Sequence, residues 1–150
     1  MDHVVYTDAK SGEMVLLISG EKRMIIRGAT GRKLPYGRVS PGDILYFMNN
    51  NAESLVKAKG VVSEVIHSDR MSESEAVAFI EKYQNKLQLT TDQIRRWSGK
   101  RYIVLIEVSQ VRETDPFPID KSRFGNMDDW LLVENIDSVT VSASRKIKIS

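Results

Sequence analysis

The chain has 150 residues, of which 41% are hydrophobic and 28% are charged, a composition typical of a folded globular domain. Its formal net charge is only +2, so the overall charge does not by itself indicate a nucleic-acid-binding protein. Cysteine is absent, which excludes disulfides, thiol catalysis and cysteine-ligated metal sites.

The two histidines, His3 and His67, lie far apart in the sequence, and we therefore expect neither a metal site nor a cofactor. The longest apolar runs, 14–18 and 44–48, are too short to cross a bilayer. Met1 is followed by Asp2 and His3 rather than by a basic start and an apolar stretch, so we expect no secretory signal. We expect one domain over residues 1–150, located in the cytoplasm and without a membrane partner.

The first residues, 3–7, are expected to form a strand or an irregular arm, and a helix follows them. Ser11 is placed to cap this helix, and the apolar residues Met14 and Leu17 recur about one turn apart. Gly20 stands where a left-handed residue ends a helix. The pattern predicts one short helix with a single apolar stripe.

Six further stretches read as strands, because apolar and β-branched residues are bounded by turn-forming residues. They are residues 23–27, 44–48, 55–66, 102–111, 130–133 and 139–141. We expect Gly60, which interrupts the third of them, to mark a bulge or a bend at a barrel corner. The stretches 28–42 and 115–126 hold glycines and prolines and are predicted to be loops, and 145–150 is a basic tail.

Between the third and fourth of these strands the sequence changes to a helical pattern. Ser72 with Glu75, and Thr90 with Gln93, form capping boxes, in which each side chain bonds to the other residue's backbone N–H. Apolar residues at helical spacing follow the first box. We therefore expect a mixed α+β fold: a small β-barrel with helices plugging its ends and a helical insertion.

Positive charge is concentrated between Lys22 and Arg38. This stretch contains no acid, and its basic residues are interleaved with three glycines and Tyr36. The basic residues are Lys22, Arg23, Arg27, Arg32, Lys33 and Arg38. Basic side chains and backbone amides freed by glycine suit a phosphate-binding surface, and an aromatic ring can stack on an unpaired base. The alternative interpretation is a solvated basic loop that only keeps the protein soluble.

Within this stretch, Gly20, Lys22 and Arg27 fall at the spacing of the signature G-x-K-x-x-E-x-R, and the sequence resembles the ASCH family of the PUA-like superfamily. The Pro-Gly-Asp turn at 41–43 and the strands that follow match the family's next elements, so the similarity covers residues 10–112. The resemblance implies a PUA-like β-barrel, the fold shared with EVE and YTH domains. It also implies a cleft that the lysine and the arginine face.

The resemblance and the basic stretch together predict an RNA- or nucleotide-binding domain, whose partner is RNA or a modified nucleoside or nucleotide. The expected binding residues are Lys22, Arg27, Arg32, Lys33, Tyr36, Arg38 and Trp130. For Trp130 two interpretations stand, because its ring either lines the cleft or caps the barrel.

The alternative function is a small hydrolase, either a ribonuclease or an amidohydrolase acting on acylated cytidine-like nucleosides, with Lys22 as its catalytic residue. The lysine would activate the nucleophile or stabilise charge. However, Ile25 stands where the family signature has glutamate, and Glu81 is only one candidate to replace it. We therefore favour binding over catalysis.

Two other places have both a structural and a functional interpretation. Trp97 lies among basic residues at 95–101, a combination that can serve RNA, but we favour packing of its ring in the core. His67 precedes Ser68 and Asp69, but sequence neighbours rarely have the geometry of a catalytic triad. We therefore expect His67 to be a surface loop residue.

Overall fold

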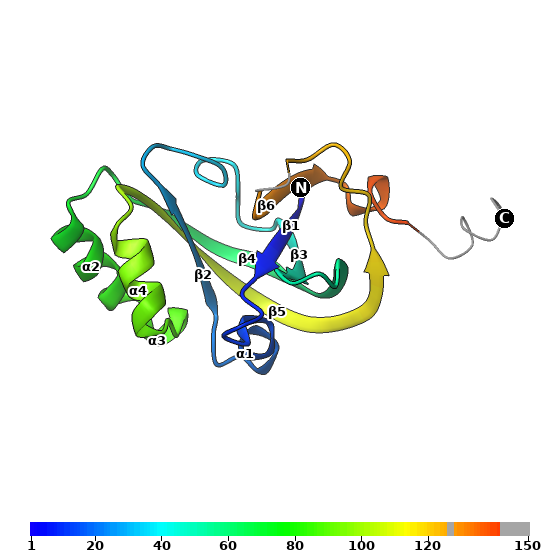
Figure 1. Cartoon of the computed structure of the whole chain (residues 1–150), viewed down its shortest axis with the longest axis horizontal. Coiled ribbons are helices and arrows are strands. Elements are labelled where there is room, and N and C mark those ends of the chain that lie inside the picture. Colours follow the sequence, from blue (N-terminus) through cyan, green and yellow to red (C-terminus); the bar gives the residue numbers. More distant parts are fainter. Residues whose placement is uncertain (126–127, 142–150) are drawn as a thin grey trace, which may run out of the picture.

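The computed structural model describes residues 1–125 and 128–141, and within them six strands form a curled sheet, a half-barrel (Figure 1). The strands are β1 Asp2–Thr7, β2 Met24–Ala29, β3 Ile44–Asn49, β4 Leu55–His67, β5 Tyr102–Pro118 and β6 Trp130–Glu134. Their order in the sheet is β2-β5-β4-β3-β1-β6. β1 runs parallel to β3, and the other neighbours are antiparallel. The predicted α+β class is confirmed.

β2 and the half of β5 that pairs with it bury side chains on both faces, because successive side chains point to opposite sides of a strand. One set of side chains, which includes Ile25 and Ile106, packs inside the half-barrel. The other set, which includes Met24 and Leu105, packs against the helices on the outside. Ile25 takes the place of the signature glutamate and is 1% exposed in the interior, where an unpaired carboxylate would be costly.

Helix α1, Glu13–Ser19, closes one end of the half-barrel by packing Met14 and Leu17 into its interior. Gly20 has a φ of 83° and ends the helix in the left-handed conformation, as predicted. The prediction for Ser11 was wrong. Gly12 occupies the N-cap position, and the Ser11 hydroxyl donates to the carbonyl of Asp8 in the preceding turn.

The predicted helical insertion is confirmed and consists of α2 Glu73–Lys82, α3 Gln84–Leu87 and α4 Thr91–Ser98. Both capping boxes are present, at Ser72 and at Thr90. The three helices gather beside β2, at the left of Figure 1. Trp97 is 7% exposed and packs in the cluster between α4 and the outer face of β2, so its predicted packing is confirmed. No helix within the described ranges is long and apolar enough to span a bilayer.

Gly60 marks a bulge, as predicted, because the pairing of β4 with β5 shifts register between Lys59 and Val61. A Cβ atom at Gly60 would lie 2.8 Å from Cγ2 of Val111, closer than real Cβ atoms approach their neighbours. Glycine therefore allows the two strands to come together at this bend.

The last strand predictions were partly wrong. β5 continues to Pro118, into the stretch 115–126 that was predicted to be a loop. Its prolines are tolerated because β2 pairs with β5 only up to Glu107, which leaves the far half of β5 paired with β4 alone. Residues 139–141 form no strand. They follow the 3₁₀ turn Ile136–Ser138 and take part in an isolated bridge between Thr140 and Ile119. The basic tail at 145–150 lies outside the described residues.

Candidate functional site

Arg27 lies at the seam where β2 faces β1 and β6, which stand at the other end of the sheet order. Its guanidinium donates to the carbonyl oxygens of Ile26 and Tyr6, at 2.8 and 2.6 Å, and its Nε lies 3.2 Å from Oδ2 of Asp129. The guanidinium carbon is also 5.7 Å from the centroid of a Trp130 ring. Arg27 is only 8% exposed, so its side chain bridges the seam from within.

Two cavities adjoin this seam, with volumes of about 110 and 190 Å³, and together they are called the Arg27 cleft below. Four residues line both of them: Arg27, Arg96, Trp97 and Asp129. The cleft therefore lies between the seam of the half-barrel and helix α4. The fold brings these residues together from β2, from α4 and from the approach to β6.

The larger cavity of the cleft has a basic wall. Lys33 comes from the loop after β2, Arg96 from α4 and Lys100 from the segment after α4. None of these three forms an ion pair with an acid within the described part of the chain. The Arg96 guanidinium carbon lies 4.5 Å from the centroid of the Trp97 ring. Unpaired cations from separate segments around one hollow create a local attraction for anions.

The smaller cavity has a wall of carboxylates and amides, formed partly by Asp8, Glu13, Asn50 and Gln93. Nε2 of Gln93 donates to Oδ2 of Asp8 at 3.1 Å, and the backbone N–H of Asp8 donates to Oε1 of Glu13 at 2.9 Å. These bonds join α4 to the turn before α1. The cleft therefore has a basic half and a half rich in hydrogen-bond acceptors.

Lys22 lies behind the acceptor-rich wall and lines neither cavity of the cleft. It is 3% exposed, its Nζ donates to the carbonyl of Leu87 in α3, and the same Nζ lies 3.4 Å from Oε2 of Glu13. Burial lowers the pKa of Lys22, and the nearby Glu13 carboxylate opposes that shift. The side chain thus connects α1 with the helical insertion, and Glu13 stands between it and the cleft.

The other predicted residues are distributed more widely. Arg27 and Lys33 line the cleft, whereas Arg38 is exposed and lines neither of its cavities. The Arg32 guanidinium lies over the rings of Tyr36 and Tyr102, with its carbon 5.9 and 5.5 Å from their centroids. The basic side chains of this loop therefore lie in different places: Lys33 lines the cleft, whereas Arg32 lies over a neighbouring pair of tyrosine rings.

The two predicted aromatic contacts, Tyr36 and Trp130, are engaged within the protein. The hydroxyl of Tyr36 donates to the carbonyl of Ser68 at 2.6 Å, and the ring is half-buried. Trp130 is 2% exposed and packs in the interior beneath Arg27. In this arrangement the Trp130 ring presents no free face to the cleft.

Arg96, Lys100, Glu13 and Asp129 were not among the predicted site residues. The basic run around Trp97 was a signal for the first two, but the sequence does not show that α4 packs beside β2. Nothing local distinguishes Glu13 from an ordinary acid in the first turn of a helix. No group of three or more histidines, aspartates and glutamates within the described ranges is arranged to hold a metal ion.

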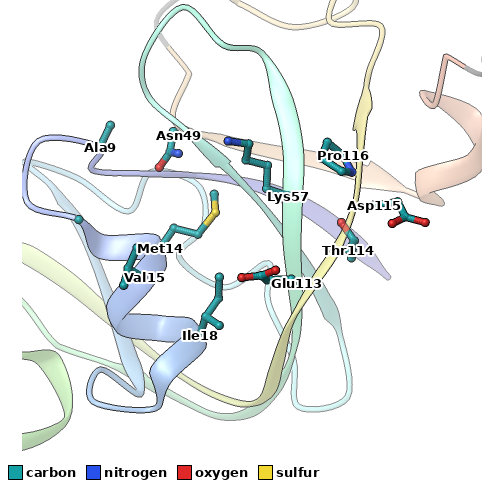
Figure 2. A pocket seen from close by; sticks show the side chains of 11 residues that line it. Ala9, Met14, Val15, Ile18, Asn49, Lys57, Glu113, Thr114, Asp115 and Pro116 are labelled. Carbon is teal, nitrogen blue, oxygen red and sulfur yellow. The ribbon is translucent and has the colours of Figure 1, made fainter.

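A larger cavity of about 490 Å³ lies between α1 and the far half of β4 and β5 (Figure 2). Apolar side chains of α1 form one wall, namely Met14, Val15 and Ile18, and the polar side chains of Lys57 and Glu113 come from the strands. Lys57 pairs with Glu53, while Glu113 and Asp115 add negative charge. This lining does not suit a phosphate, whereas the cavity at the Arg27 cleft is lined by the basic residues Arg27, Lys33, Arg96 and Lys100.

The curled sheet, with a helix in its open end, defines a mixed α+β fold that solved structures share. The structure of ASCH from Zymomonas mobilis has a TM-score of 0.65 and 12% identity, covering 99% of this chain and 92% of that chain. Two single-residue variants of the same protein give the same score and identity, covering 95% and 93% of their chains. No family model and no curated protein matches the sequence. The chain has the ASCH fold, as its sequence predicted.

Proposed function

We propose that the Arg27 cleft binds RNA or a nucleotide and holds phosphate in its basic half. The observation that carries this proposal is the convergence of Lys33, Arg96 and Lys100 on one cavity without acidic partners in the described part of the chain. Lysine and arginine contacts to phosphate supply most of the affinity of such sites. The ASCH fold supports the proposal, because that family includes RNA-binding modules.

The acceptor-rich half of the cleft favours an unpaired nucleotide as the ligand. Carboxylate and amide oxygens of Asp8 and Asn50 can accept hydrogen bonds from the amino and imino groups of a base. A base can reach them only when it is free of a paired strand. Arg27 is buried, and its two terminal guanidinium nitrogens donate to backbone carbonyls at the seam. We therefore expect Arg27 to contribute positive charge beneath the ligand, while the more exposed cations make the direct contacts.

Fluorescence anisotropy with an eight-residue oligouridine, at two salt concentrations, tests this function. Single changes Lys33→Ala, Arg96→Ala and Lys100→Ala should each weaken binding about fivefold, and the affinity of the wild type should fall steeply with salt. Arg38→Ala and Arg95→Ala are matched controls, because both remove an exposed arginine that does not line the cleft. They should change affinity less than twofold. Absence of saturable binding at low salt, or equal losses in the controls, would refute the proposal.

A hydrolase remains the second candidate, because Glu13 lines the cleft and is held by the buried Lys22. In this function Glu13, rather than the lysine, would take a proton from a water molecule that adds to an acyl carbon. The carbon–nitrogen bond would then break as the amine received the proton. Turnover of an N-acylated cytidine and cleavage of oligouridine are the assays, with Glu13→Gln expected to abolish either activity. A wild-type protein that is inert in both assays would exclude this candidate.

A further inference from the structure

The loop that carries Lys33 to the cleft has two hydrogen-bonded attachments near the end of β4, one from Tyr36 to the carbonyl of Ser68 and one to the side chain of His67, the last residue of β4. The backbone N–H of Gly37 donates to Nε2 of His67 at 2.8 Å. The His67 ring also meets the ring of Tyr36 edge-on, with 4.6 Å between centroids. His67 is exposed, but it is a strand residue with a specific partner, which corrects the expectation of a surface loop position.

Short contacts connect this attachment to the site. The N–H of Tyr36 donates to the carbonyl of Lys33 at 2.9 Å, which closes a turn between the two residues. Lys33 and the adjacent Leu34 line the basic half of the cleft. If Gly37 separates from His67, Lys33, which lies four residues earlier and is a cation of the proposed phosphate site, should therefore also be displaced.

We propose that His67 is a positioning residue, which holds the Lys33 loop at the cleft only while its imidazole is uncharged, so that acid weakens ligand binding. This rests on the proposed binding function. Nε2 can accept from Gly37 only when it carries no proton, which places the ring proton on Nδ1. An imidazolium has N–H groups at both nitrogens, so it cannot accept this bond and would direct a donor at the Gly37 N–H.

The surroundings of His67 add to this effect. Arg32, Tyr36 and Arg38 belong to the loop packed against it, and Asp69 and Arg70 follow it in the chain. Tyr102 of β5 lies beyond Tyr36, with 5.9 Å between the centroids of the two rings. Between Gly31 and Arg38 the charged residues of the loop are Arg32, Lys33 and Arg38, all of them basic, so a positive charge on His67 would also repel the loop. Histidine is the side chain that changes charge between about pH 5 and 8.

Two substitutions distinguish the effect of the charge on His67 from the effect of its ring shape. His67→Gln places an amide oxygen, a non-titrating acceptor, close to the position of Nε2. His67→Phe keeps an aromatic ring beside Tyr36 and removes the acceptor. Oligouridine is the probe because its internal phosphodiesters do not titrate between pH 7.5 and 5.5. His3 is present in all three proteins, so its titration does not distinguish them.

We expect wild-type affinity for oligouridine to fall about five- to tenfold from pH 7.5 to 5.5 at constant ionic strength. His67→Gln should bind like the wild type at pH 7.5 and change less than twofold with pH, whereas His67→Phe should bind weakly at both values. A fall in His67→Gln equal to that of the wild type, or full affinity in His67→Phe, would overturn the inference.

Amide exchange at Gly37 provides a readout that needs no ligand. Its protection at pH 7.5 should be about tenfold lower in His67→Phe than in the wild type and in His67→Gln. If no protein binds oligouridine, the proposed function fails, and equal Gly37 protection in all three proteins would show that the attachment fails as well.

Discussion

The indole Nε1 of Trp130 donates a hydrogen bond of 3.0 Å to Nδ1 of His3, and both side chains are almost completely buried. Because an indole N–H can only donate, Nδ1 is the acceptor and the imidazole proton resides on Nε2. Nε2 lies 2.8 Å from Oδ2 of Asp43. With Arg27 next to the Trp130 ring, a buried series of contacts runs from the Asp43 turn to the floor of the cleft.

Acid should destabilise the fold through His3. Burial lowers the pKa of His3, although the hydrogen bond and charge of Asp43 oppose the shift. Since the folded state binds this proton less readily than the unfolded state, the free energy of unfolding falls as the pH drops below the unfolded-state pKa, by up to about 1.4 kcal/mol per pH unit. Urea unfolding between pH 7.5 and 5 should show a flatter profile for His3→Gln than for the wild type. A slope that persists in His3→Gln would argue against this origin.

Trp130→Phe should destabilise the protein by about 1–3 kcal/mol, because it leaves Nδ1 of His3 buried without a donor. The ring volume that remains preserves part of the packing, so the missing hydrogen bond should account for much of the change. Chemical unfolding of the wild type and of Trp130→Phe measures this difference in the free energy of unfolding. In the His3→Leu background, the same Trp130→Phe change should cost less, because no buried acceptor remains. Equal costs in the two backgrounds would contradict the assignment.

Lys22→Met should cost about 3–5 kcal/mol, because it leaves the buried Glu13 carboxylate without its cation and the Leu87 carbonyl without its donor. The double variant Lys22→Met with Glu13→Gln should be more stable than Lys22→Met alone, since the uncompensated charge is gone and an amide oxygen can still accept from Asp8. Urea unfolding of the three proteins provides the comparison. A Lys22→Met variant within 1 kcal/mol of the wild type would show that the pair is not needed.

Arg27→Lys should lower stability by about 1–3 kcal/mol although it preserves the charge. An ammonium group cannot reproduce the fork that donates to Ile26 and Tyr6 while facing Asp129. Arg23→Lys, at an exposed position one residue before β2 begins, is the matched control and should be neutral. Thermal unfolding tests both, and equal melting temperatures for the two variants would mean that the seam does not depend on the guanidinium.

Local patterns predicted the local structure well. The capping boxes at Ser72 and Thr90 and the helix stop at Gly20 depend on residues a few positions apart, and all three are confirmed. The extension of β5 to Pro118 depends on pairing with the distant β4, which proline-based rules do not include.

The site was harder to predict because its residues meet only in the folded chain. Of the residues in the basic stretch, Arg27 and Lys33 line the cleft, whereas Lys22 lies behind Glu13. Arg96 reaches the cleft because Trp97 anchors α4 on the outer face of β2. Such a meeting depends on packing between segments about 70 residues apart, which composition and periodicity do not encode.

The burial of both faces of β2, and of the half of β5 paired with it, also limits how far this chain can be shortened. Met24, Ile26, Ile103 and Leu105 are each no more than 2% exposed on the face that the helical insertion covers. Deleting α2 to α4 would expose these four side chains to water and create an apolar surface that promotes aggregation. A reduced version of the domain would therefore need polar replacements on that face, and it would also lose Arg96, so the insertion is integral to both solubility and the cleft.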